Sequence, residues 1–383
     1  MLRSRVGLCS RHLTFTFISF IKSLNGLYEP PSSVYILLGP GKFHSISSAF
    51  IPPSLSHKHT VMKKWGILFI TLLTTTLSTH AQLSKKEIAA AVDTIAAIIH
   101  RSYVHEAKGA QIAAAFKAAH QQGNFNNTTT WKGFDSLATQ LLRSISHDGH
   151  LYVRNDPATV KTLLAPPDTI TQQTEDDFHY GPAAREKNYG FSEVRILNNN
   201  IGYIKLSEIN ISHKSLPVLY GAMQFVAHTR ALIIDLQGNG GGGSDIGPVI
   251  ESFFLKNNTP LLQVKRRNGT TENIKTVSWL TQEKYTAPVF VMINNRTASA
   301  AEALAFCLQS QKRATIVGQP SAGGANMNEW FPVNEQLYVS VSTASPTLPG
   351  TNTTWEQKGV QPDEVTEPGK EIQAAVSRMH FLP

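Results

Sequence analysis

Two stretches of this 383-residue chain end an apolar strand in residues suited to holding an anion. In ALIIDLQGNGGGG, residues 231–243, the strand is followed by five glycines between Gly238 and Gly243. Because glycine has no Cβ atom, these amides can closely approach a phosphate or an oxyanion formed during a reaction. In PVFVMINNRTASAAEALAF, residues 288–306, Ser299 stands between a strand and a helix start, where free amides favour negative charge. A hydroxyl opposite a glycine loop would suit nucleophilic attack and oxyanion stabilisation.

Ser299 also fits a purely structural role. A serine that precedes a helix and is followed three residues later by glutamate can form a capping box, in which each side chain binds the other residue's amide. Glu302 stands at that spacing. From the residues alone, Ser299 is therefore either a helix cap or a nucleophile.

The glycine loop has a second interpretation as well. Gly238, Gly240 and Gly243 satisfy the G-x-G-x-x-G pattern of dinucleotide-binding enzymes between a strand and a predicted helix. An acidic residue about 20 positions later binds the ribose in such enzymes, but here the basic run Lys265 to Arg267 occupies that region. Only a phosphorylated dinucleotide such as NADP would suit this arrangement. An oxyanion hole facing a nucleophile is the competing interpretation.

Helical periodicity dominates the segment 82–154. Ser84 and Glu87 form a predicted capping box at the start of its first helix. We therefore predict a small helical N-terminal domain at 82–154, with helices at 83–104, 109–123 and 131–146. The polar, proline-containing stretch 155–188 that follows predicts a linker or an exposed hairpin.

Strands alternate with helices in the segment 189–383, which predicts an α/β core. One of two predicted hairpins turns at Asn268 and Gly269. The predicted elements are hairpins at 193–206 and 261–277, buried strands at 231–236, 288–294 and 314–318, and helices at 215–229, 245–255 and 299–309.

Residues 62–81 have the features of a secretory signal peptide. Lys63 and Lys64 precede a short apolar stretch, and small residues lead to a cleavage site expected after Ala81. Residues 1–61 are then interpreted as an upstream extension translated in error, with a signal anchor behind a genuine extension as the alternative. We expect an exported protein, periplasmic or extracellular, without a stable membrane anchor after processing.

The formal charge of +8 belongs mostly to this leader. Eight Lys and Arg residues but only Glu29 lie before position 82, so the remainder carries about +1, which does not indicate nucleic-acid binding. Cys9 lies in the leader, and Cys307 alone cannot form an internal disulfide. No spaced set of metal ligands is present in the sequence, so no metal is expected.

Four motifs together resemble the C-terminal-processing, or tail-specific, serine peptidase family: LIIDLQGNGGGG, VFVMINNRTASAAEALAFCL, RATIVGQPSAGGANMN and TNTTWEQKGVQPDEVT. Their order and spacing are most similar to the branch that includes the tricorn core protease and the repeats of interphotoreceptor retinoid-binding protein. SISHDGHLYV resembles the end of the helical cap in that branch. The resemblance implies a crotonase/Clp-protease-like β-α core, a small helical N-terminal domain before it, and no cofactor.

By position, the resemblance makes Ser299 the nucleophile and places the amides of Gly241 and Ala300 in the oxyanion hole. His150 matches the general base, and Glu356 matches the carboxylate that orients it. Such a set is chemically coherent, because a hydroxyl needs a base within hydrogen-bond reach and the base needs an acceptor that fixes its tautomer.

The chain departs from the family pattern at three points. Gly324 stands where the other branch has a lysine base, so a Ser/Lys pair is excluded. Gly149 replaces a serine that precedes the histidine in the tricorn-like branch, so a supporting hydroxyl is missing. No PDZ-like segment separates the helices from the core. Because the lysine is missing at position 324, the base is expected to be His150, with His147 in reserve.

The resemblance implies a serine endopeptidase acting on peptides or unfolded proteins. A non-catalytic binding protein for apolar ligands or peptides is the alternative, and an NADP-type dinucleotide-binding enzyme is a third. Nothing in the sequence determines whether the chain forms an oligomer.

Overall fold

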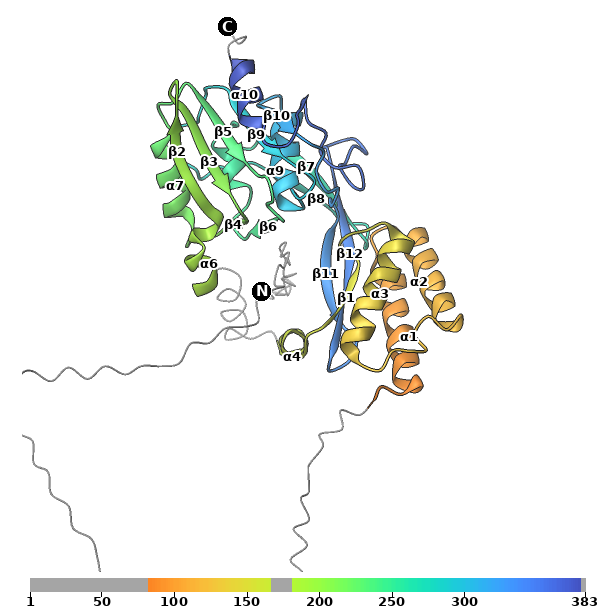
Figure 1. The fold of residues 1–383 in the computed structure, drawn as a ribbon. Helices are drawn as coiled ribbons and strands as arrows, with labels where there is room; N and C mark the ends of the chain where they lie inside the picture. The colour runs from red at the N-terminus through yellow and green to blue at the C-terminus, as the bar shows by residue number, and fades with distance from the viewer. Residues whose placement is uncertain (1–81, 167–180, 380–383) are drawn as a thin grey trace, which may run out of the picture. The chain divides into compact units, whose positions relative to one another are not determined.

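The structure, a computed structural model, describes residues 82–166 and 181–379 (Figure 1). The predicted extension at 1–61, the predicted signal peptide at 62–81 and part of the predicted linker lie outside the described residues. No helix in the two described ranges is long and apolar enough to cross a lipid bilayer.

Three helices open the described chain: α1 (Lys85–Ser102), α2 (Glu106–Gln121) and α3 (Trp131–Ser146). At the start of α1 the amide of Ser84 donates to Glu87 Oε2 at 2.8 Å, and the amide of Glu87 donates to Ser84 Oγ at 3.2 Å. The chain leaves α2 through Gly123, which has a left-handed φ of +86°. The three predicted helices and the first capping box are therefore confirmed.

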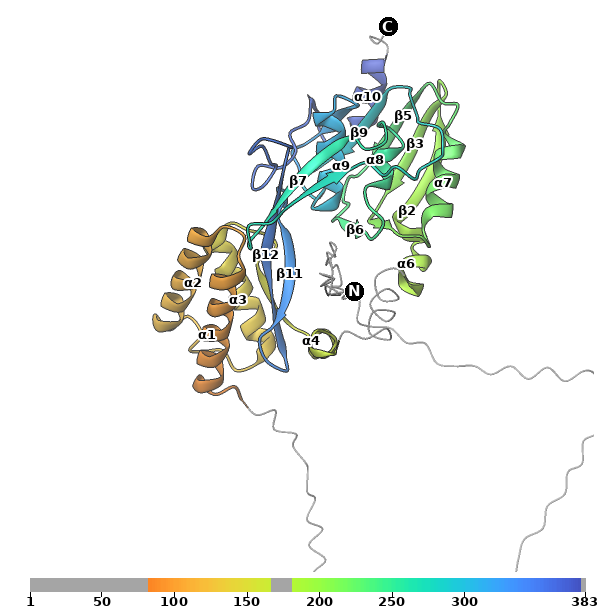
Figure 2. The ribbon, with the colours of Figure 1, turned by 180° about the vertical axis from the view of Figure 1, so that it is seen from behind.

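These helices pack against a five-stranded sheet made of β1 (Tyr152–Asn155), β7 (Pro260–Arg266), β8 (Thr271–Lys275), β11 (Met327–Pro332) and β12 (Leu337–Thr347). The strand order is β1-β12-β7-β8, and β11 also pairs with β12. Leu337, Val339 and Val341 share one buried cluster with the apolar faces of the helices. In both views the helices lie beside β1 and β12, so a strand almost 200 residues away completes their core (Figures 1 and 2).

A second, six-stranded sheet has the order β13-β10-β9-β5-β3-β2. Only β2 runs antiparallel to its neighbour, and β3, β5, β9, β10 and β13 are parallel. Its strands are β2 (Phe191–Leu197), β3 (Ile201–Leu206), β5 (Ala231–Asp235), β9 (Val289–Ile293), β10 (Ala314–Gly318) and β13 (Glu364–Val365). Buried apolar runs in β5 and β9 match a parallel sheet that is covered on both faces.

Helices cover both faces of this sheet. On one face Ile234 and Val291 pack with Leu304 of α9 (Ala300–Ser310) and with α7 (Leu216–Phe225). On the other face Ile233 and Phe290 pack with Ala375 of α10 (Glu371–Met379). The chain thus has a mixed α/β fold with N-terminal helices, and the two predicted hairpins and the buried strands are confirmed.

The described parts of the predicted linker contain helices and no hairpin. They are α4 (Pro157–Leu164), α6 (Pro182–Glu186) and a 3-10 turn at Asn188–Gly190. Asp156 Oδ1 accepts from the amide of Thr159 at 3.1 Å, and Pro157 occupies the first turn of α4. A cap followed by proline is a helix-start signal that the hairpin interpretation overlooked.

Candidate active site

Ser299 lies at a tight turn between β9 and α9. Its φ of 56° and ψ of −122° are those of the first central residue of a type II′ turn, and the amide of Ala301 closes this turn by donating to the carbonyl of Ala298 at 3.2 Å. Such a conformation is costly for a residue with a side chain. A serine held on a strained strand-to-helix turn projects its hydroxyl away from the backbone, as a nucleophile requires.

The Ser299 hydroxyl does not cap α9. Ser299 is 2% exposed, and its Oγ atom has no hydrogen-bond partner in the described chain. Its amide donates to Glu302 Oε2 at 2.7 Å, so Ser299 and Glu302 take the paired positions of the predicted capping box, but the hydroxyl accepts no hydrogen bond from the Glu302 amide. A buried hydroxyl without a partner costs free energy, which favours the nucleophile over the cap.

Glu302 fixes this turn to the loop at 321–324. Its side chain is fully buried, and it also accepts from Ser321 Oγ at 2.6 Å, from the amide of Gly323 at 2.6 Å and from the amide of Gly324 at 2.9 Å. Burial raises the pKa of Glu302, while these three donors and the amide of Ser299 act to lower it. Sequence reasoning gave Glu302 only a capping role and missed that it joins the two loops.

His150 meets this assembly at Gly324. A Cβ atom at position 324 would lie 3.1 Å from His150 Cε1 and 3.6 Å from Glu302 Oε2. The imidazole therefore occupies space that a side chain at 324 would need, in the place where the other branch has its lysine. Gly324 thus brings His150 close to the Ser299 turn, although Ser299 Oγ and His150 are not hydrogen-bonded.

The surroundings of the His150 side chain favour its neutral form. Burial lowers the pKa of His150, the charge of Asp148 opposes this shift, and Arg143 reinforces it. Its buried Nδ1 atom has no hydrogen-bond partner among the described residues. The tricorn-like branch has a serine at the position of Gly149, so this chain lacks a hydroxyl beside the histidine. A Cβ atom at Gly149 would have no heavy atom within 4 Å.

Glu356 does not hydrogen-bond His150 in this structure. Its Oε2 atom accepts from the amides of Ala325 at 2.8 Å and Asn326 at 3.0 Å. Burial and then the nearby charge of Asp148 raise the pKa of Glu356 to about 7. The Glu356 side chain therefore binds the loop that follows Gly324, but it does not make the direct contact with His150 that the resemblance implies.

Asp148 is the carboxylate bound directly to the base loop, and sequence reasoning missed it. It is 1% exposed; its Oδ1 accepts from the amide of His150, and its Oδ2 accepts from Tyr103 Oη, both at 2.9 Å. Burial and the charge of Asp148 raise the pKa of Tyr103, so the phenol stays a donor. The reserve base, His147, instead ends α3 as an exposed residue with a φ of 55°.

The predicted oxyanion hole is half formed. Gly241 has a φ of +109°, and a Cβ atom there would lie 2.7 Å from Ser299 Cβ, so only glycine permits this approach. The amide of Ala300 has no acceptor within the described ranges, as expected at a helix start. The amide of Gly241, however, donates to Asn239 Oδ1 at 2.9 Å. To stabilise an oxyanion, the Gly241 amide would have to break its hydrogen bond to Asn239 Oδ1 and donate to the substrate oxygen instead.

The dinucleotide interpretation of the glycine loop is wrong in its structural premise. Gly242–Ser244 form strand β6, which pairs in parallel with β4 (Ile209–Ile211). The helix that follows, α8, covers only Val249–Ser252, so the loop does not lead directly into a long helix as the dinucleotide pattern requires. A pyrophosphate site needs the amides and dipole of such a helix. The strand pairing of β6 instead holds the loop against Ser299.

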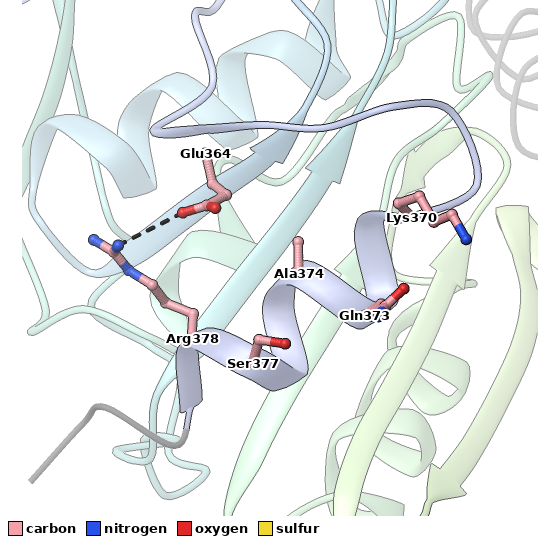
Figure 3. Close-up of a pocket in the computed structure, with 6 residues that line it drawn as sticks. All are labelled: Glu364, Lys370, Gln373, Ala374, Ser377 and Arg378. Atoms are coloured by element: carbon pink, nitrogen blue, oxygen red, sulfur yellow. Dashed lines mark ion pairs between the residues drawn. The ribbon is translucent and has the colours of Figure 1, made fainter.

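A separate cavity of about 350 Å³ lies at α10 (Figure 3). It is lined by Glu364, Lys370, Gln373, Ala374, Ser377 and Arg378. Arg378 is paired with Glu364 at 3.5 Å, and no histidine lies beside Ser377 in the lining. Because α10 and α9 cover opposite faces of the sheet, this cavity is not part of the Ser299 site.

The model of peptidase family S41 matches residues 200–366, which include Ser299, Gly241 and Glu356. The chain is therefore similar to this family of serine-type peptidases over 167 of its 383 residues. Family S41 relatives include a carboxyl-terminal-processing protease of Synechocystis, 29% identical over 177 residues, which are 44% of this chain and 38% of that protein. A carboxy-terminal-processing protease of Bartonella bacilliformis is 29% identical over 178 residues, 45% and 40% of the two chains. The matched regions thus span about two fifths of these curated relatives.

A solved structure shares the fold of this chain. A candidate peptidase from Parabacteroides merdae has a TM-score of 0.50 at 15% identity, over 78% of this chain and 97% of that one. The tricorn protease has a TM-score of 0.48 at 12% identity, over 77% of this chain and 36% of that one. No group of three or more His, Cys, Asp or Glu side chains in the described ranges could hold a metal ion.

Proposed function

We propose that this chain is an exported serine endopeptidase that hydrolyses peptide bonds in peptides or unfolded proteins. Ser299 attacks the carbonyl carbon, and His150 accepts the hydroxyl proton and gives it to the leaving amine. Water then attacks the resulting ester, with His150 again accepting and returning a proton, which releases the acid product and restores the Ser299 hydroxyl. The amides of Ala300 and, once released by Asn239, Gly241 stabilise the oxyanion. The core that holds these groups is of the crotonase/Clp-protease-like type, preceded by the helical segment.

One observation supports this proposal above the others. A buried hydroxyl without a hydrogen-bond partner lies on a positive-φ turn, and a histidine fills the side-chain space of the glycine beside that turn. A structural serine would be bonded, and a structural histidine would not require glycine at 324. In an unliganded site the base and nucleophile are often too far apart to bond, and substrate brings them together.

The test is hydrolysis of unfolded casein by the purified protein, measured beside the Ser299→Ala and His150→Ala variants. We expect a loss of at least about a thousandfold in kcat for each variant, because nucleophile and base act as a unit. Loss in Ser299→Ala alone would move the role of base away from His150. Full activity in both variants would overturn the proposed site.

A non-catalytic binding protein is the second candidate. It is favoured by two contacts that oppose catalysis in this structure: the Gly241 amide is bound to Asn239, and Glu356 is bound to backbone amides instead of His150. If the unaltered protein binds peptides but cleaves none from a varied set of unfolded substrates, this second function replaces the first.

A further inference from the structure

Two arginine side chains lie over one tyrosine ring beside the base loop. The guanidinium carbon of Arg154 is 4.7 Å from the centroid of the Tyr152 ring, and that of Arg143 is 5.8 Å from the same centroid. We call Arg143 and Arg154 the arginine pair. Tyr152 lies on β1, two residues after His150, so the pair is next to the base on the chain.

Arg143 has no carboxylate partner among the described residues. Its Nη2 atom donates to the carbonyl of Gly149 at 2.7 Å, and the other N–H groups of the guanidinium make no hydrogen bond within the described ranges. The nearby carboxylate Asp148 already accepts from the His150 amide and from Tyr103. Burial of part of the side chain and then the charge of Arg154 lower the pKa of Arg143, although the residue as a whole is exposed.

Arg154 is only weakly compensated. Its Nη1 atom is 3.4 Å from Asp135 Oδ1, whereas the other oxygen of Asp135 binds Lys132 at 3.0 Å and the amide of Asn155 at 3.0 Å. Two cations, Lys132 and Arg154, thus share one carboxylate at this edge of the sheet. The two guanidinium groups repel each other, although the face of the Tyr152 ring attracts each of them, and an arriving anion would relieve this repulsion.

A cluster of aromatic rings continues from the pair, with Tyr152 and Trp330 partly exposed and Tyr338 buried. Trp330 Nε1 donates to Tyr152 Oη at 3.0 Å, and the Trp330 ring lies 5.2 Å from the ring of Tyr338. Tyr152 and Trp330 are both opposite Ser340 on β12, and Ser340 Oγ donates to the carbonyl of His150 at 2.6 Å. The cationic group and the base are therefore joined through one row of the sheet.

We propose that the arginine pair is a substrate subsite that binds a carboxylate of the peptide, with Arg143 as its main donor. This inference rests on the proposed peptidase function, because the ligand is the same peptide that reaches Ser299. The planar guanidinium group can donate two parallel hydrogen bonds to a carboxylate, and the partly exposed rings of Tyr152 and Trp330 would contact adjacent apolar atoms. The carboxylate comes from the peptide C-terminus or from an acidic side chain.

Direct binding distinguishes the inference from hydrolysis. Three acetylated hexapeptides of alanine and leucine are titrated calorimetrically into the Ser299→Ala protein: one with a free C-terminal carboxylate, its C-terminal amide, and an amide with one internal glutamate. We expect the free carboxylate or the glutamate peptide to bind about ten times more tightly than the neutral amide. Preference for the first identifies the C-terminus as the source, and preference for the second identifies a side chain.

Arg143→Gln should reduce the preference to about twofold or less, and Arg143→Lys should keep part of it. Because only the ratio between peptides is compared, a general weakening through the lost Gly149 contact cancels. Arg195→Gln is the matched control, since Arg195 lies 4.6 Å from the Tyr203 ring centroid but has its own carboxylate, Glu193, at 2.9 Å. The control should leave the ratio unchanged.

Equal affinity for charged and neutral peptides, a ratio that survives Arg143→Gln, or no binding of any peptide would overturn the subsite. If the unaltered protein hydrolyses peptides without preferring a carboxylate, the subsite fails while the peptidase function stands. If a carboxylate preference that requires Arg143 is measured for a protein that cleaves nothing, the subsite stands and the catalytic proposal fails.

Discussion

Replacing Ser299 by glycine should stabilise the folded protein while removing the proposed nucleophile. The φ of 56° and ψ of −122° at Ser299 belong to a region that costs a residue with a side chain about 1–3 kcal/mol. Glycine relieves this strain but has more unfolded-state freedom, which costs about 0.5–1 kcal/mol. No hydrogen bond of the hydroxyl is lost. The net gain in the free energy of unfolding should be about 1 kcal/mol.

Urea unfolding followed by tryptophan fluorescence measures this difference, with Ser299→Ala beside Ser299→Gly. Alanine keeps the Cβ atom and therefore keeps the strain, so the glycine variant should be the more stable of the two. A gain of about 1 kcal/mol corresponds to a rise of about 2–4 °C in Tm for a protein of this general size. Both variants should lack hydrolytic activity.

Ser84 supplies the control at an ordinary helix cap. Its φ is −76°, and its hydroxyl accepts from the amide of Glu87, so both Ser84→Gly and Ser84→Ala should lower stability. A Ser299→Gly variant that is less stable than the unaltered protein would refute the argument. It would mean either that the turn is unstrained or that the hydroxyl has a partner that stabilises the fold.

Gly324→Ala should lower kcat about tenfold by displacing the His150 ring, because its Cβ would lie 3.1 Å from Cε1; Gly221→Ala, with open space around it, is the control. Asp148→Asn should shift the acid limb of the kcat/KM profile to lower pH, because Asp148 raises the pKa values of His150 and Glu356; an unmoved limb would show that neither titration controls the rate. Burial and Asp148 raise the pKa of Glu356 to about 7, so its stabilising contribution is full below about pH 4.5 and lost as pH rises through about 7. Thermal unfolding of Glu356→Gln between pH 5 and 8 should vary less with pH than that of the unaltered protein, and an equal variation would contradict this sign.

Local signals predicted much of the fold. The capping box at Ser84, the hairpin turn at Asn268 and the apolar runs of β5 and β9 depend on neighbouring residues, so their elements were found. β12 was not predicted, because its serines and threonines suggest exposure although all eleven residues are buried. They are buried because the strand pairs with β1, β7 and β11, and no local pattern contains these partners.

The candidate site divides in the same way. The positions of Ser299 and the glycine loop follow from the strands before them, but the approach of His150 to Gly324 requires the packing of α3 and β1 against β12. Two missed contacts did have a local signal. Asp148 and Asn239 each accept from the amide two residues later, which is a common hydrogen bond of these residue types.

Those two contacts have opposite effects on the proposed chemistry. The bond from the His150 amide to Asp148 orders the base loop and leaves the imidazole free, whereas the bond from Gly241 to Asn239 occupies an amide that the oxyanion needs. A substrate oxygen that becomes negatively charged is a stronger acceptor than the neutral Asn239 amide. The exchange at Gly241 would therefore be most favourable in the transition state, so that the second half of the oxyanion hole contributes to catalysis more than to substrate binding.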